Sequence, residues 1–168
     1  MTFLPKKVHK ICLANVPIVS VDVVILNHFR NKVLLFKRNN NPLKGVYYTL
    51  GGRVFKNESI IDTATRKLDE EAGLIVQKKE LFFGGIMEEF FENSIYKSID
   101  THNVNIFLGY IACEKLSVRL DEQHTKCEWF NITSNSLHPQ VRYKIDLIYN
   151  KECFFYDPGA NLSIFGKQ

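Results

Sequence analysis

The chain has 168 residues, with 22 Lys and Arg against 18 Asp and Glu, a net charge of +4, and 45% hydrophobic residues. This length and apolar fraction are ordinary for one globular domain and exclude a disordered chain, a collagen and a coiled coil. The four cysteines include no C-x-x-C pair, which argues against a zinc ribbon or a dense disulfide framework. We therefore expect a single domain over residues 1–168.

The sequence also predicts where the protein acts. The apolar stretch after the basic N-terminus is interrupted by Asp22, lacks a small-residue cleavage site and is shorter than the ~20 residues that cross a bilayer. We expect a cytoplasmic protein without a membrane partner. A net charge of +4 does not by itself indicate nucleic acid and suits an anionic small-molecule substrate as well, so we expect no nucleic-acid partner.

Short runs rich in Val and Ile dominate the first fifty residues. They predict a β-hairpin of strands 16–26 and 32–37 with a polar turn at 27–31, then a loop at 39–45 and a short strand at 46–50. The pair Gly51-Gly52 predicts a break after this strand.

The next segment has apolar residues at helical spacing. It predicts an amphipathic helix over residues 58–72, with Asn57 as N-cap and Gly73 as C-cap glycine. The rest of the chain predicts strands at 81–91, 104–113 and 126–131 and a last helix at 139–150. Strands on both sides of one central helix indicate a mixed α/β domain.

The central helix carries the residues that suit chemistry. Helical spacing places Arg66, Lys67, Glu70 and Glu71 along one edge of the buried face. Carboxylates held on a rigid helix are ligands that suit Mg²⁺. Taken alone, the same residues also describe an ordinary solvated helix face with an i,i+4 ion pair between Arg66 and Glu70.

The full spacing resembles the Nudix box, G-x5-E-x7-R-E-U-x-E-E-x-G-U, in which U is a bulky apolar residue. Eight of the nine specified positions match, namely Gly52, Glu58, Arg66, Leu68, Glu70, Glu71, Gly73 and Leu74. The resemblance implies the Nudix fold, an α/β fold with a mixed β-sheet sandwiched between α-helices. Lys67 is the exception, because it replaces the first Glu of the box's R-E pair and weakens a multi-metal site by like-charge repulsion.

Four further segments resemble the GDP-mannose mannosyl hydrolase branch of that family. They are Pro17 to Asp22, Leu34 to Asn40, Gly45 to Arg53, and Asp121 to His124 before Trp129. The branch also lacks this box Glu, and it releases GDP and free mannose by breaking the bond at the sugar carbon. Glu89 and Asn103 stand where the branch has a His and a Tyr, which leaves the sugar open.

The resemblance implies a cofactor, a base and a set of substrate contacts. It implies one Mg²⁺, with Mn²⁺ as an alternative, held by Glu71, the Gly51 carbonyl, the Gln123 side chain and the diphosphate, with Glu70 as an outer or second ligand. It implies His124 as general base, Arg38 on the departing diphosphate, Asp22 beside the sugar, Arg53 toward the substrate and Arg66 orienting the box carboxylates. It also implies a homodimer that takes a small-molecule nucleotide-sugar.

The implied chemistry is coherent. GDP leaves readily once Mg²⁺ and arginines neutralise its charge, so the remaining need is a base for water, and a histidine with a pKa near ~6.5 suits that role. We expect hydrolysis of a GDP-sugar at the anomeric carbon with inversion. The alternatives are a conventional Nudix pyrophosphatase that cleaves a P–O–P bond with Glu70 and Glu71 as its metal site, and a catalytically inactive Nudix-like binding module.

Overall fold

The computed structural model of the chain describes residues 4–96, 98–113 and 116–150. Within these ranges the chain forms one seven-stranded mixed sheet. The strands are β1 (Ile18–Leu26), β2 (Lys32–Arg38), β3 (Tyr47–Tyr48), β4 (Leu50–Arg53), β5 (Leu81–Phe91), β6 (Thr101–Ile111) and β7 (His124–Asn131). Strand β1 is shared, because it runs parallel to β6 and pairs antiparallel with β2 near its end and with β4 near its start.

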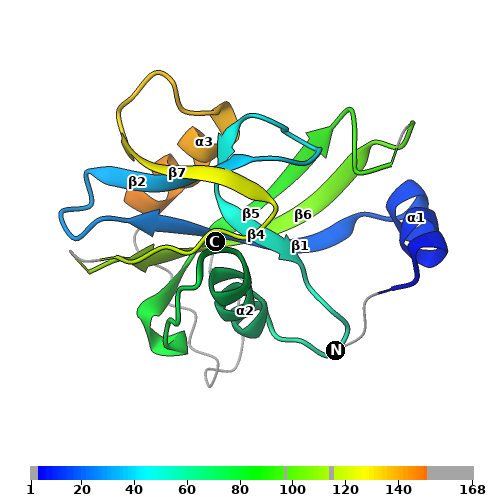
Figure 1. The fold of residues 1–168 in the computed structure, drawn as a ribbon, viewed down its shortest axis with the longest axis horizontal. Coiled ribbons are helices and arrows are strands. Elements are labelled where there is room, and N and C mark those ends of the chain that lie inside the picture. The colour runs from blue at the N-terminus through cyan, green and yellow to red at the C-terminus, as the bar shows by residue number, and fades with distance from the viewer. Residues whose placement is uncertain (1–3, 97, 114–115, 151–168) are drawn as a thin grey trace, which may run out of the picture.

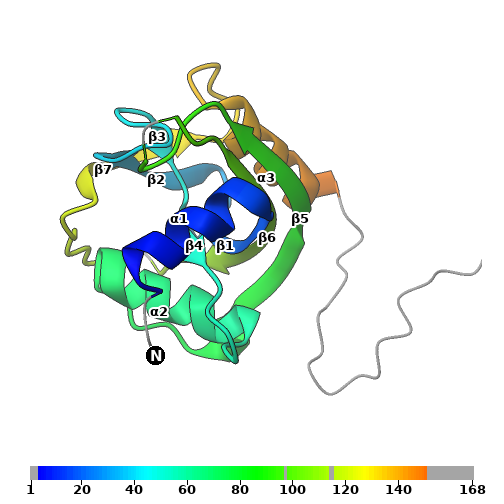
Figure 2. The same cartoon turned by 90° about the vertical axis from the view of Figure 1, so that its right-hand side faces the viewer.

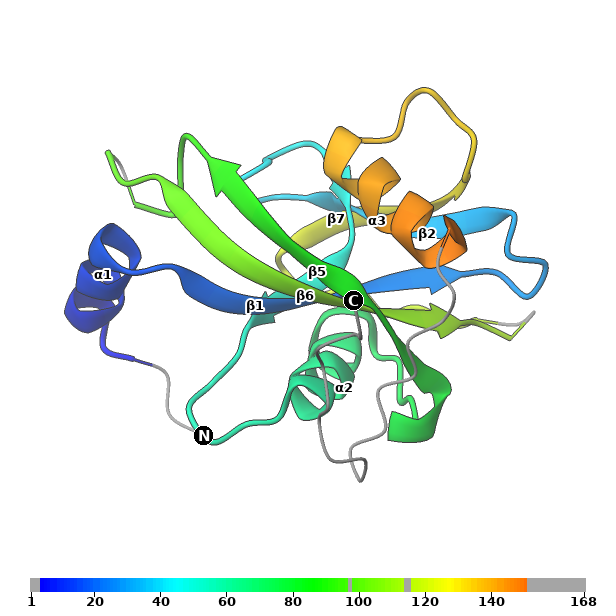
Figure 3. The same cartoon turned by 180° about the vertical axis from the view of Figure 1, so that it is seen from behind.

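Helices α2 (Ile60–Ala72) and α3 (Pro139–Asn150) cover opposite faces of this sheet, below and above it in Figure 1 and again in Figure 3. Side chains alternate across β1, so its odd-numbered apolar residues pack with Ala64 and Leu68 of α2. Its even-numbered apolar residues pack with Val141 and Ile145 of α3. The predicted mixed sheet between helices is therefore confirmed, and the even-numbered Asp22 belongs to the α3 face.

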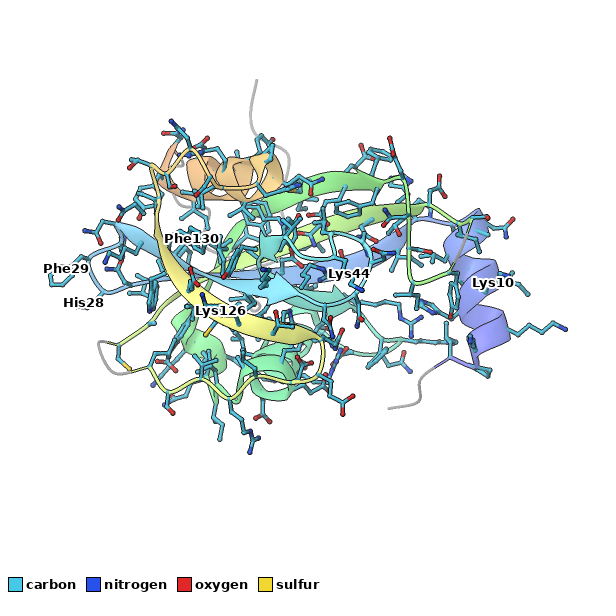
Figure 4. All side chains as sticks on the ribbon, turned by 45° about the horizontal axis from the view of Figure 1, so that its top comes forward. Lys10, His28, Phe29, Lys44, Lys126 and Phe130 are labelled. Atoms are coloured by element: carbon cyan, nitrogen blue, oxygen red, sulfur yellow. The ribbon has the colours of Figure 1, made fainter. Side chains whose placement is uncertain are left out.

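Helix α1 (Lys6–Asn15) was not expected from the sequence. It begins after Pro5, has no side-chain N-cap and no buried residue, and therefore lacks the pattern that predicts a packed helix. It lies at one end of the molecule (Figure 1), and with that end turned toward the viewer it stands in front of the sheet (Figure 2). Lys10 on this helix and His28 and Phe29 in the β1–β2 turn lie at opposite ends (Figure 4).

Most predicted elements are observed, among them the hairpin, the helix at 139–150 and the C-cap Gly73, which has a left-handed φ of 65°. The predicted N-cap is wrong. The Ser59 hydroxyl accepts from the Asp62 backbone N–H at 3.1 Å, whereas Asn57 has a φ of 67° in the preceding turn. A one-turn 3-10 helix, η1 (Lys78–Glu80), precedes β5. None of the described helices is long and apolar enough to cross a membrane.

The expected break at Gly51-Gly52 is also wrong, because both glycines continue β4. Gly51 pairs with Asp22, and a Cβ on Gly51 would lie 2.0 Å from the Asp22 Oδ1 atom. Here glycine permits close pairing of two strands, which residue type alone does not distinguish from a turn. The strand expected at 126–131 begins two residues earlier, at His124.

Candidate active site

A pocket of about 640 Å³ is lined by residues of β1, β4, β5, β6 and α2 and by Gln123, which directly precedes β7. Six predicted site residues line it, namely Asp22, Arg38, Gly51, Arg53, Glu70 and Gln123. The other three, Arg66, Glu71 and His124, are not among its lining residues. Arg66 and Glu71 nevertheless hydrogen-bond to the lining residues Glu70 and Lys67.

A charged network fixes the helix side of this pocket. The Arg66 guanidinium donates to both oxygens of Glu58, at 2.7 and 2.9 Å, and to Glu70 at 3.1 Å. These bonds from Arg66 are the main reason why the pKa of Glu58 falls to about 2. The two-pronged contact sets the direction of the Arg66 side chain and, through it, that of the Glu70 carboxylate.

Lys67 occupies the space between the two box carboxylates. Its ammonium Nζ lies 2.9 Å from Glu71 Oε1 and 3.3 Å from Glu70 Oε2. Its carbon stem runs over Gly52, where a Cβ would approach Lys67 Cε to 2.5 Å. Glu71 is only 2% exposed; this burial raises its pKa, and the Lys67 ammonium acts in the opposite direction.

His124 opens β7 opposite Arg38 and is held by a neighbouring carboxylate. Its Nδ1 lies 2.9 Å from Asp121 Oδ1, and its side chain is 2% exposed. Its Nε2 is buried and has no hydrogen-bond partner among the described residues. With Nδ1 donating to Asp121, Nε2 carries a lone pair, which is the state that a general base requires.

The two predicted substrate arginines differ in how much of their hydrogen-bonding capacity is used. Arg38 donates its Nε–H to the Pro42 carbonyl at 2.8 Å, which braces the loop at the pocket rim. Arg53 lies over the Phe55 ring, 5.3 Å from its centroid, and its Nη1 is buried without a partner in the described part of the chain. Gln123 donates its side-chain amide to Asp121 at 3.1 Å, which leaves its amide oxygen for another partner.

A second charged cluster, which the sequence analysis missed, joins α3 to the pocket wall. Its members Asp22, Tyr48, Thr49 and Glu89 line the pocket, and Lys144 lies behind them. Lys144 of α3 is 0% exposed, and its ammonium contacts Asp22 and lies 2.9 Å from Glu89 Oε1. The Tyr48 hydroxyl donates to Glu89 at 2.6 Å and Thr49 donates to Asp22 at 2.7 Å. Burial, together with the nearby Glu89 carboxylate, raises the pKa of Tyr48, so its hydroxyl stays a donor.

One signal in the sequence pointed to this cluster. Lys144 stands three residues after Val141 and four before Ile148, so it interrupts an apolar helix stripe, just as Asp22 interrupts an apolar strand. A buried charge is costly unless it is paired, and two such interruptions of opposite sign predict that they meet. The positions of Tyr48 and Glu89 carried no comparable signal.

The oxygen atoms of the predicted metal site fit a hard divalent cation in type. The carboxylates of Glu70 and Glu71, the Gly51 carbonyl and the Gln123 amide oxygen are all oxygen donors, which Mg²⁺ prefers. Across residues 4–96, 98–113 and 116–150, no three His, Cys, Asp or Glu side chains converge on a common metal position. Such a sparse donor set suits Mg²⁺ bound through one or two carboxylates together with substrate phosphates.

Comparisons with known proteins identify the family of the chain. The family model described as NUDIX domain matches residues 16–149. The low-salt glycan biosynthesis protein Agl8 of Haloferax volcanii is 33% identical over 147 residues, which are 88% of this chain and 92% of Agl8. An ADP-ribose pyrophosphatase of Methanocaldococcus jannaschii is 43% identical over 65 residues, 39% of this chain and 37% of that protein.

Solved structures show the same fold. A MutT NUDIX hydrolase from Burkholderia pseudomallei superposes with a TM-score of 0.63 at 20% identity, over 79% of this chain and 98% of that one. The family match covers most of the chain and includes the box helix and both flanking strand groups. The chain therefore belongs to the Nudix hydrolase family.

Proposed function

We propose that this Nudix hydrolase cleaves a GDP-sugar, GDP-mannose foremost, to GDP and free sugar by attack of water on the anomeric carbon with inversion. The position of Lys67 carries this proposal. In the place of a box Glu stands an ammonium that holds Glu70 and Glu71 at 3.3 and 2.9 Å. A water aimed at phosphorus therefore has no unpaired box carboxylate to activate it, and the base has to come from elsewhere.

The charges around the pocket suit the two halves of such a substrate. Arg38 and Arg53 present guanidinium groups, which match the geometry of a diphosphate. Asp22 and Glu89 present carboxylates on the same pocket. Those groups accept hydrogen bonds from sugar hydroxyls, and Asp22 stabilises positive charge that develops at the anomeric carbon.

Nudix hydrolases generally use divalent metals such as Mg²⁺ or Mn²⁺, and the oxygen donors around Lys67 fit one. In this proposal Glu71, the Gly51 carbonyl and Gln123 hold Mg²⁺, with Glu70 as a second carboxylate. When bound, the ion neutralises the departing diphosphate, so that no general acid is needed. Arg66 keeps Glu70 oriented through its bond at 3.1 Å.

His124 is the base of the proposed reaction. Asp121 holds its Nδ1 at 2.9 Å, so Nε2, which has no hydrogen-bond partner among the described residues, is directed away from Asp121. The reaction requires that a water reach this nitrogen from the pocket that the adjacent Gln123 lines. The proton of the attacking water then passes to Nε2, and Asp121 stabilises the imidazolium that forms.

The similarity to Agl8 supports a substrate from glycan metabolism, because the name of that protein places it in glycan biosynthesis. We include in the proposal a homodimer, a cytoplasmic location and a single domain over residues 1–168. These remain predictions from the sequence. The segment 151–168 lies outside the described residues.

The experiment that tests the reaction is hydrolysis of GDP-mannose in ¹⁸O-water with Mg²⁺, with GDP-, UDP- and ADP-sugars as the comparison panel. The label should appear in the free sugar and not in GDP, and the anomeric configuration should invert. Label in a phosphate, or sugar 1-phosphate among the products, would contradict the proposal. No turnover of any of these substrates would favour a binding module.

The base is tested by substitution. His124→Ala should lower kcat by roughly 10²- to 10⁴-fold with little change in KM, and the pH profile of kcat should differ from that of the wild type. His28→Ala is the matched control, because His28 is exposed in the β1–β2 turn (Figure 4). If His124→Ala keeps the pH profile of the wild type, another residue is the base.

A pyrophosphatase is the second candidate, and one finding favours it. The chain is 43% identical to the ADP-ribose pyrophosphatase over 65 residues, a higher identity over a shorter segment than the 33% over 147 residues for Agl8. That protein, by its name, cleaves ADP-ribose at the diphosphate. The products decide between the candidates, because this reaction would release a nucleoside monophosphate and a sugar phosphate.

A further inference from the structure

Lys67 lies between the predicted metal-binding carboxylates and the pocket, so a bound metal ion would repel its ammonium and a bound phosphate would attract it. Residues three and four apart on a helix face the same way, so its ammonium meets the carboxylates of Glu70 and Glu71 on α2. Its side chain is 13% exposed, and Lys67 and Glu70 both line the pocket. Unlike a fully buried ion pair, this one is open to whatever enters the pocket.

Lys67 competes with a divalent cation for these two carboxylates. The ammonium takes one oxygen of each carboxylate at hydrogen-bond or ion-pair distance, and two positive charges at this range repel each other. Gly52 lies under the Lys67 stem, with a Cβ position 2.5 Å from Lys67 Cε, so the side chain cannot withdraw toward β4. To free the carboxylates, the ammonium has to swing into the pocket.

A diphosphate in the pocket supplies the ammonium with a new partner. Lys67 shares the pocket wall with Arg38 and Arg53, the two guanidinium groups of the proposed diphosphate site. Phosphate oxygens bind an ammonium as carboxylates do, so the lysine loses little when it exchanges one for the other. The carboxylates it leaves are then available to a metal.

From this geometry we infer that Lys67 couples metal binding to nucleotide binding: it blocks the carboxylates of the free protein and releases them to the metal when a nucleoside diphosphate takes its ammonium. The inference rests on the proposed function only in taking a nucleoside diphosphate as the ligand. Linkage requires the coupling to be reciprocal, so the metal must strengthen nucleotide binding by the same factor.

The test measures binding of Mn²⁺, with and without GDP, by electron paramagnetic resonance of the free ion. Lys67→Met removes the charge and keeps the length of the side chain, and Lys67→Glu restores the box acid. Without nucleotide, Lys67→Met should bind Mn²⁺ at least ~10-fold more tightly than the wild type, and Lys67→Glu at least as tightly as Lys67→Met. GDP should strengthen Mn²⁺ binding by the wild type by ~10-fold or more, and by Lys67→Met clearly less.

Lys79→Met is the matched control, because Lys79 is an exposed lysine of η1 outside the pocket lining, and its Mn²⁺ affinity should stay at the wild-type value. Equal Mn²⁺ affinities of wild type and Lys67→Met, or an equal effect of GDP on both, would overturn the inference. The titration with Mn²⁺ alone is independent of the reaction. Sugar 1-phosphate among the products would therefore overturn the proposed function and leave this result standing.

Discussion

Two lysines in this molecule each bind two carboxylates, and they differ in what surrounds them. Lys67 binds Glu70 and Glu71 within one turn of α2, with a side chain 13% exposed at the pocket. Lys144 brings together Asp22 of β1 and Glu89 of β5, and its side chain is 0% exposed. Each cluster has the same formal charge of about −1.

The difference in exposure of the two ammonium groups decides which lysine can exchange a carboxylate for another partner. An ion pair open to a pocket can trade a carboxylate for a substrate oxygen, since the incoming group replaces the lost contact. Asp22 and Glu89 also line the pocket, but the Lys144 ammonium is 0% exposed and does not line it, so the ammonium cannot move to a group that enters the pocket. Its removal leaves uncompensated charge in the protein interior. We therefore assign exchange to the Lys67 cluster and a fixed pocket wall to the Lys144 cluster.

Removal of the sealed ammonium should have the largest effect on stability. Lys144→Met leaves Asp22 and Glu89 buried without their cation and should lower the free energy of unfolding by about 3–5 kcal/mol, as measured by urea denaturation. The double variant Lys144→Met/Glu89→Gln removes one negative charge as well and should recover part of the loss. A loss below about 1 kcal/mol for Lys144→Met would mean that the two clusters do not differ as described.

Removal of a carboxylate from the open cluster should affect turnover and leave the fold intact. Glu71→Gln should lower kcat by at least ~10²-fold, about 3 kcal/mol of transition-state stabilisation, because a charged metal ligand is lost. Glu70→Gln should be milder, since Glu70 is the more exposed member of the pair. If Glu70→Gln proves the more damaging change, the roles of the two carboxylates are reversed.

The ion pair of Glu58 with Arg66, which orients Glu70 of the Lys67 cluster, should make the free energy of unfolding sensitive to acid. In the folded protein the pKa of Glu58 is lowered from 4.5 to about 2, so its contribution to stability is complete above pH 4.5 and is lost as the pH falls toward about 2. Urea unfolding at pH 5 and pH 3 should show a smaller pH dependence for Glu58→Gln than for the wild type. Glu122→Gln, which changes an exposed carboxylate, should retain the wild-type dependence.

The smallest effect on stability is expected for Lys67→Met. Glu70 is exposed and keeps its bond to Arg66, but Glu71 is 2% exposed and loses its ammonium. The free energy of unfolding should therefore fall by about 1–2 kcal/mol, less than for Lys144→Met, where two buried carboxylates lose their cation. The same urea series as for Lys144→Met measures it. A loss as large as that of Lys144→Met would show that the ion pairs of Lys67 are structural, and would contradict the exchange of partners.

The elements themselves were largely predictable. Runs rich in Val and Ile around a polar turn predicted the hairpin, and helical spacing predicted α2 and α3, since those patterns depend on neighbours within a few residues. Helix α1 and the pairing of Gly51 in β4 were missed. Helix α1 has no buried face and therefore no apolar pattern in the sequence. The pairing of Gly51 depends on Asp22, which lies opposite it on β1.

What the sequence alone determined is the local half of the site. The spacing of Arg66, Lys67, Glu70 and Glu71 on one helix sets their contacts, because i,i+3 and i,i+4 neighbours meet wherever the helix packs. Only the tertiary structure decided the other half. Lys144 reaches Asp22 because the pleat of β1 turns even-numbered side chains toward α3, and that contact depends on how helix and sheet pack rather than on any spacing along the chain.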